Sequence, residues 1–274
     1  MLMLSHPSGS RFIDDIASLA LRFPEGPKGW TLARIKRRFC RAIAVLSLTL
    51  VGSAHGYAAD GGTRDVFGSW SSLTLSGNFE GISPDFQRFR WLVMDQVRTR
   101  DDSPAGTRFS ENLVWAQLGY DISEYASVWL GYTHAWIDPL DKPSAQESRP
   151  YQDLLLNIPF LSGRLMSRTR LEQRINPSGG DVGIRARQWI QYSHPLPVIS
   201  EKLSVFAGDE VLAYFNDSPF GVNGFSENRV LAGVSYQFTG HLGVDLGYLG
   251  QYVVNKAGPD LFTHNLWANL RYQF

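Results

Sequence analysis

A ladder of charged side chains between positions 164 and 174 carries the most suggestive chemistry in this sequence. The charged residues share the even positions, and Leu165, Thr169 and Leu171 share the odd ones. The charged set is Arg164, Arg168, Arg170, Glu172 and Arg174. Guanidinium groups bind carboxylates and phosphates through charge-assisted hydrogen bonds, and when buried they persist only if they are paired. The ladder therefore predicts either an anion site or an internal ion-pair network.

A second basic run lies a short distance along the chain. Arg185 and Arg187 share one parity, while Ile184 and Ala186 share the other. We expect Arg168, Arg170, Glu172, Arg185 and Arg187 to form one connected network, with Glu172 between arginines of its own strand and of its neighbour. Further members on the same wall are expected to be Arg164, Arg174, Glu210 and Arg229, and carboxylates that could balance the arginines are Glu172, Asp209, Glu210 and Asp245.

Alternation with a period of two residues is typical of β-strands that have one polar and one apolar face. The predicted spans are Phe86 to Arg100, Phe109 to Ile122, Ala126 to Ile137, Arg149 to Pro159, Gly163 to Ile175, Asp181 to His194, Leu203 to Phe215, Asn228 to Phe238, Leu242 to Val254 and Thr263 to Phe274. A shorter candidate runs from Gly68 to Phe79. On Phe86 to Arg100, Asp95 interrupts the apolar face without an evident partner. The pattern indicates an all-β protein with a single barrel domain.

The end of the chain indicates which kind of barrel this is. Leu266, Ala268, Leu270, Tyr272 and Phe274 alternate with mainly polar residues up to a terminal aromatic. A strand with one apolar and one polar face suits a closed barrel in lipid, where outward arginine at the midplane costs about 2–4 kcal/mol. Leu270, Tyr272 and Phe274 also resemble the C-terminal insertion signal of bacterial outer-membrane barrels. The fold class predicted is a transmembrane antiparallel up-and-down β-barrel of 10 to 12 strands.

The N-terminal region predicts export. Basic residues from Arg34 to Arg41 precede an apolar run from Ala42 to Val51, and small residues follow near Ala58 and Ala59, which is the order of a secretory signal. We therefore expect a leader at residues 1–31, with translation starting near Leu32, then a signal peptide at 32–59, an N-terminal segment or first strand at 60–85, and a barrel at 86–274. The apolar run is too short for a membrane-spanning helix.

The exported part would be mildly acidic and free of cysteine. Eight of the 26 Lys and Arg residues and three of the 26 Asp and Glu residues precede Asp60, which leaves 18 basic and 23 acidic residues, a net charge of −5. This charge argues against a nucleic-acid partner. The single cysteine, Cys40, lies in the basic part of the signal, so disulfides and cysteine-ligated metals are excluded. No phosphate loop, metal-ligand spacing or nucleotide fingerprint is present, and no cofactor is expected.

Turn lengths predict the topology. Short turns at Ser123 to Tyr125, Leu161 to Ser162 and Thr239 to His241 alternate with longer loops at 138–148, 216–227 and 255–262. In bacterial barrels the short turns are periplasmic and the long loops extracellular. Counted back from a periplasmic C-terminus, ten or twelve strands place both ends in the periplasm and eleven do not. We therefore expect Gly68 to Phe79 to be a non-spanning segment or half of a hairpin.

Several motifs together resemble the bacterial family catalogued as domain of unknown function 2490. They are the run from Glu111 to Tyr120, Ser167 to Arg174, Arg185 to Gln188, Gly208 to Glu210, Asn228-Arg229 and the closing strand. The resemblance covers nearly all of the exported part. It implies an outer-membrane barrel and carries no activity with it.

Three functions remain open. The charge ladder could fill and rigidify a narrow lumen, or line a small anion-selective pore or a barrel that binds an anionic solute. A hydrolase would need a serine beside a histidine base, and the spacing of His134, His194, His241 and His264 provides none. We expect a non-enzymatic protein of the bacterial outer membrane, whose partners are outer-membrane lipids, the barrel-assembly machinery and, in the second case, a small anionic solute.

Overall fold

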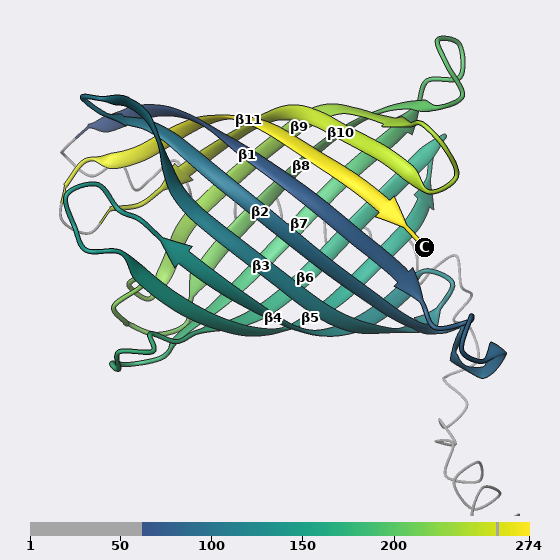
Figure 1. Cartoon of the computed structure of the whole chain (residues 1–274), viewed down its shortest axis with the longest axis horizontal. Helices are drawn as coiled ribbons and strands as arrows, with labels where there is room; N and C mark the ends of the chain where they lie inside the picture. The colour runs from purple at the N-terminus through teal and green to yellow at the C-terminus, as the bar shows by residue number, and fades with distance from the viewer. Residues whose placement is uncertain (1–61, 256–257) are drawn as a thin grey trace, which may run out of the picture. The chain divides into compact units, whose positions relative to one another are not determined.

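A closed β-barrel forms the part of the chain that the structure, a computed structural model, describes: residues 62–255 and 258–274 (Figure 1). The predicted leader, signal peptide and Cys40 lie outside these residues. Within them eleven strands follow one another around the ring, each hydrogen-bonded to its two neighbours. The all-β barrel predicted from the alternating sequence is confirmed.

The strands are long enough to tilt steeply across the wall of the barrel (Figure 1). Their bounds are β1 Thr63–Asn78, β2 Phe89–Ser103, β3 Gly106–Ser123, β4 Ala126–Ile137, β5 Ala145–Phe160, β6 Gly163–Arg174, β7 Gly183–Pro195, β8 Leu203–Tyr214, β9 Gly224–Gln237, β10 Leu242–Val253 and β11 Asp260–Gln273. A short 3-10 helix, η1, covers Pro84–Phe86 between β1 and β2. All ten predicted spans form strands, and the shorter candidate is β1.

The predicted range of 10 to 12 strands includes the observed eleven, but the inference from the topology that the count must be ten or twelve is wrong, and so is the view of Gly68 to Phe79 as a non-spanning segment. Strand β1 pairs in parallel with β11, from Thr63 opposite Asp260 to Ser76 opposite Gln273. All other neighbouring pairs are antiparallel. An even count is required only when the first and last strands also run in opposite directions. The parallel seam allows an odd count, and the purely up-and-down topology is corrected at this one pair.

The barrel has two ends, which we call the loop end and the C-terminal end. Residues 138–144, 175–182, 215–223 and 254–259 connect strands at the loop end, where β1 also begins. Phe274 lies at the C-terminal end, and its N–H donates to the carbonyl of Ser76. The expected alternation of loop length has three exceptions. At the C-terminal end the β1–β2 connection contains η1 and the β7–β8 connection covers 196–202, as long as the loop 138–144, and at the loop end the β2–β3 turn spans two residues.

Apolar side chains cover the outer face of the barrel wall and polar side chains line its inner face, which is the opposite of the arrangement in a soluble protein. Outward residues such as Leu118, Leu130 and Leu266 are 61–68% exposed, whereas buried polar residues outnumber buried hydrophobic ones in the described chain. Aromatic side chains gather on the outside at the C-terminal end, with ring contacts between Phe89 and Tyr120, Tyr236 and Phe238, and Tyr272 and Phe274. A second group at the loop end includes Phe67, Tyr132, Trp136, Tyr248 and Phe262. Between them the outer wall is largely aliphatic.

The terminal strand follows its predicted faces. Leu266, Leu270, Tyr272 and Phe274 are exposed, and Asn265 and Asn269 are buried. No helix in residues 62–255 or 258–274 is long and apolar enough to cross a membrane.

Candidate functional site

A ring of six alternating charges lies inside the barrel towards the loop end. Arg185 pairs with Glu172 at 2.5 Å, and Glu172 pairs with Arg187 at 3.2 Å. Arg187 pairs with Glu210 at 2.8 Å, and Glu210 pairs with Arg229 at 3.1 Å. Arg229 contacts Glu227, which closes the ring onto Arg185 at 3.8 Å. The six charges of this ring cancel.

Four consecutive strands, β6 to β9, supply the ring. The register sets Glu172 directly opposite Arg185 and Glu210 directly opposite Arg229. Side chains directly opposite one another share a face of the sheet, so these pairs meet inside the lumen. Alternation then places the next arginine, Arg187, on the same face two residues later. The charged ladder of residues 164–174 therefore lies on β6, the first of four neighbouring strands that carry the charge network.

The ring is enclosed by protein. Exposed fractions of its side chains run from 1% for Glu172 to 11% for Arg229. A buried charge is tolerated only when it is paired and hydrogen-bonded, and each carboxylate of the ring contacts at least two arginines. Glu210 contacts a third, because Arg168 donates from Nη2 to its Oε1 at 2.7 Å.

Further ion pairs extend the ring around the wall. Arg170 donates through Nε and Nη2 to both oxygens of Asp153, each at 2.7 Å, and its guanidinium lies 3.5 Å from the ring centre of Tyr151. Glu147 contacts both Arg149 and Arg174. On the other side of the lumen Arg98 pairs with Glu111 at 2.9 Å.

Trp70 connects the two sides. The Arg98 guanidinium lies 3.6 Å from the ring centre of Trp70, and that of Arg229 lies 5.0 Å from it. Cation–π contacts of this kind stabilise arginines that lack water. From Glu227 the chain of contacts continues to Gln251, Thr263 and Asn265 on the last two strands. Polar contacts thus extend over most of the circumference at this level.

Eight of the nine residues predicted to line the lumen network take part in these contacts, and the ninth does not. The eight are Arg168, Arg170, Glu172, Arg174, Arg185, Arg187, Glu210 and Arg229. Arg164 is exposed near the C-terminal end of the same face. Both ion-pair partners of Glu172 come from β7, so the expectation that it also pairs within its own strand is wrong.

Two of the candidate balancing carboxylates lie away from the ring. Asp209 accepts from the side chain of Asn228 at 2.9 Å, and strand alternation puts it on the opposite face from Glu210. Asp245 faces the lumen nearer the C-terminal end, where it pairs with Arg271 at 2.7 Å.

Sequence reasoning missed several members of the network. Glu147 and Glu227 fell in predicted loops because the spans were begun too late, at Arg149 and Asn228. Parity could have found them, since Glu147 shares the face of Arg149 and Asp153, and Glu227 shares that of Arg229.

A repeated tetrapeptide offered another signal. Phe-Ser-Glu-Asn occurs at 109–112 on β3 and again at 225–228 on β9. At both sites the register shifts by one residue, which marks a β-bulge. At both sites the asparagine amide donates to an aspartate of the preceding strand, Asn112 to Asp95 at 2.7 Å and Asn228 to Asp209. The repeat explains Asp95, and it aims Glu111 and Glu227 into the lumen.

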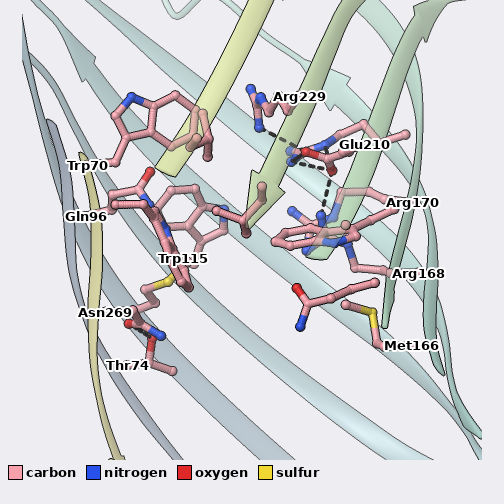
Figure 2. Close-up of a pocket in the computed structure, with 18 of the residues that line it drawn as sticks. Trp70, Thr74, Gln96, Trp115, Met166, Arg168, Arg170, Glu210, Arg229 and Asn269 are labelled. Atoms are coloured by element: carbon pink, nitrogen blue, oxygen red, sulfur yellow. Dashed lines mark hydrogen bonds and ion pairs between the residues drawn. The ribbon is translucent and has the colours of Figure 1, made fainter. Parts of the chain in front are cut away.

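A cavity of about 310 Å³ lies beside the ring (Figure 2). Trp70 and Trp115 face it from one side, and Arg168, Arg170 and Glu210 from the other (Figure 2). Thr74, Gln117, Met166 and Asn269 also line it. This size falls at the lower end of the range of small-molecule pockets, about 300–1,000 Å³.

The histidines make no catalytic arrangement with serine among the described residues. His134 contacts Tyr132 and Gln146, and His264 contacts Tyr248 and Asp65. His194 contacts Tyr192, and His241 contacts the carbonyl of Gln273. A serine nucleophile needs a histidine base within hydrogen-bond reach. The described residues also contain no group of three side chains that could hold a metal ion.

Comparisons with known proteins give a family and one relative. The family model described as "Protein of unknown function (DUF2490)" matches residues 67–262. An uncharacterized protein of Methylorubrum extorquens is 29% identical over 155 residues, which cover 56% of this chain and 68% of that protein. No solved structure matches the chain.

Proposed function

This chain belongs to the DUF2490 family of proteins of unknown function, and we propose that it is an integral barrel of the bacterial outer membrane whose lumen is closed by its charged ring. The observation that carries the proposal is the reversed polarity of the wall. Leucines 61–68% exposed on the outside surround a lumen where Glu172 is 1% exposed. Such an apolar outer band between two aromatic groups is what a barrel in lipid needs.

The burial of the ring favours a structural role for its charges over an open pore. A water-filled channel leaves its charged lining exposed to solvent. Here the ring side chains are at most 11% exposed, and every carboxylate is shared between arginines. Closely packed, fully paired charges of this kind hold the strands in register and leave no continuous aqueous path at their level.

The terminal strand supports the orientation. Leu270, Tyr272 and Phe274 point outward at the end of β11, as an insertion signal read by the barrel-assembly machinery requires. We infer that the C-terminal end faces the periplasm and that the loop end, with the start of β1, faces outward. Export would use the predicted signal at residues 32–59.

Single cysteines test location and orientation together, because Cys40 is the single cysteine of the sequence and precedes the predicted cleavage site. Lys142 lies in an exposed loop at the loop end, and Gly240 in an exposed turn at the C-terminal end. We expect both variants in the outer-membrane fraction. A membrane-impermeant maleimide should label Lys142→Cys on intact cells and Gly240→Cys after lysis only.

Recovery of the protein in the soluble fraction would contradict the membrane assignment. The opposite labelling pattern on intact cells would leave the protein in the membrane and reverse its orientation. Deletion of Phe274 should lower the amount of heat-modifiable barrel in the outer membrane, and undiminished assembly would count against the insertion signal.

A further inference from the structure

The cavity beside the ring has an apolar and aromatic body. Four tryptophans line it, and methionine and leucine side chains complete the wall: Trp70, Trp115, Trp189, Trp267, Leu92, Met94, Met166, Leu231 and Leu249. Trp70, Leu231 and Leu249 form one buried cluster with Phe206. A site dominated by apolar walls with a few placed polar groups is the usual form of a small-molecule pocket.

Arg168, which lines this cavity, carries a positive charge that no described carboxylate outside the neutral ring balances. The ring alone is neutral, with three arginines and three glutamates, and Arg168 is attached to it as a seventh charge through Glu210. Within the part of the chain that the structure describes, that contact is the one hydrogen bond that the Arg168 guanidinium makes. Its Nε atom is buried without a hydrogen-bond partner there. By contrast, Arg187 uses Nε, Nη1 and Nη2 on the two neighbouring glutamates.

Arg168 is also the arginine of this group that solvent reaches most. Its side chain is 19% exposed, compared with 4% for Arg170 and 9% for Arg187. It lies over the face of Trp189, with 4.8 Å between the guanidinium carbon and the ring centre. An apolar wall therefore continues directly from the unbalanced cation.

The lumen is more exposed on the C-terminal side of the cavity than on its loop side. On the loop side the buried ring blocks it. On the other side the lumen wall carries Arg90 and Arg271, each with 36% of its side chain exposed, and the exposed Arg164. Arg90 and Arg271 are paired there with Asp121 and Asp245, so this side of the lumen is lined by separate, partly exposed ion pairs and is more exposed to solvent than the loop side.

From these four observations we propose that the cavity binds a small amphipathic anion: a molecule with an aromatic or aliphatic body and one carboxylate or phosphate group. The anionic group binds Arg168, and the body packs between Trp70, Trp115 and Trp189. This site goes beyond the proposed function, which assigns no ligand, and under the inferred orientation its more exposed side faces the periplasm.

Calorimetric titration of the purified barrel in lipid nanodiscs tests the proposal, with 1-naphthoate as the probe. The matched neutral compound is 1-naphthylmethanol, and inorganic phosphate is an anion without an apolar body. We expect 1-naphthoate to bind at least about tenfold more tightly than the alcohol, because a charge-assisted hydrogen bond is worth roughly a decade or more in affinity. Octanoate should bind, and inorganic phosphate should bind more weakly than either carboxylate.

Two variants and a control locate the site. Arg168→Gln should lose most of the preference for naphthoate over the alcohol, while Glu210 keeps Arg187 and Arg229. Met166→Trp should reduce the binding of both naphthalene compounds by filling the cavity. Arg164→Gln, on the same face of the same strand but at the exposed mouth, should bind naphthoate within about twofold of the unchanged protein, since screened surface charges contribute little.

Equal affinity for naphthoate and the alcohol would overturn the proposal, and so would unchanged naphthoate binding by folded Arg168→Gln. Heat-modifiable migration shows that each variant is folded. Because binding is measured on the purified barrel, a negative result here leaves the membrane assignment standing, and mislocalisation in cells leaves this result unaffected.

Discussion

The two halves of the lumen satisfy their charges in different ways. Towards the loop end each glutamate of the ring contacts two or three arginines, and the side chains are at most 11% exposed. Towards the C-terminal end the pairs Arg90–Asp121 and Arg271–Asp245 stand separately, and 36% of each arginine side chain is exposed. The cavity lies between the buried charged ring and these partly exposed ion pairs.

The difference follows from where carboxylates are placed on neighbouring strands. At the loop end the register sets acidic and basic residues opposite one another on four strands in succession, so the pairs join into a network that excludes water. At the C-terminal end the pairs Arg90–Asp121 and Arg271–Asp245 are not joined to one another, and 36% of each arginine side chain stays exposed to solvent. One wall can thus combine a rigid, closed half with a half that can accept a ligand.

Removing one charge of the ring should give the largest loss of stability. Glu172→Gln leaves Arg185 and Arg187 facing each other without their shared carboxylate, and we expect a loss of about 3–5 kcal/mol in the free energy of unfolding, as for a broken buried ion pair. Urea unfolding of the barrel in lipid vesicles measures it. A loss of at most about 1 kcal/mol would mean that water screens the ring and that the two halves do not differ.

The next largest difference should come from truncating one apolar residue in each half of the lumen and comparing the losses in the free energy of unfolding. Leu212→Ala, at a side chain with 0% exposure, should cost about 2–5 kcal/mol. Met166→Ala, on the wall of the cavity, should cost less than about 1 kcal/mol, because it enlarges a space that water can already occupy and opens no new void. Similar losses for the two variants in the same urea assay would show that the cavity is packed as tightly as the loop-end half.

A methyl group at Gly131 should have a smaller effect. A Cβ atom there would lie 2.2 Å from the ring of Tyr151, the ring on which Arg170 stacks. Overpacking of this kind costs about 1–3 kcal/mol, so Gly131→Ala should lower the free energy of unfolding by that amount. Gly81→Ala, where nothing lies within 4 Å, is the control, and equal effects of the two changes would exclude a packing role for Gly131.

The strands and the face on which each side chain lies follow largely from the alternation of polar and apolar residues, which can be read directly from the sequence. The bounds of β4 match the predicted span Ala126 to Ile137, and the parity of Arg168, Arg170 and Glu172 placed them on one face. Local patterns do not report which strands meet across the seam, so the parallel pairing of β1 with β11 could not be predicted. Nor does parity choose partners: Glu172 is shared between Arg185 and Arg187 because of inter-strand register, and register depends on the bulges and turn lengths of the whole wall.

The cavity could not be predicted from the sequence. Its tryptophans come from β1, β3, β7 and β11, and nothing in their separate strands indicates that they surround one space. The unbalanced charge of Arg168 likewise becomes evident only after the three arginines of the ring have been assigned their carboxylates.

A planar-bilayer recording of the purified, unchanged barrel tests most directly whether the charged ring closes the lumen. We expect no unitary current steps at either polarity, because the buried, fully paired ring leaves no aqueous path at its level. Reproducible, anion-selective conductance steps from the unchanged protein would contradict the closed lumen and would make the arginine wall the lining of a pore.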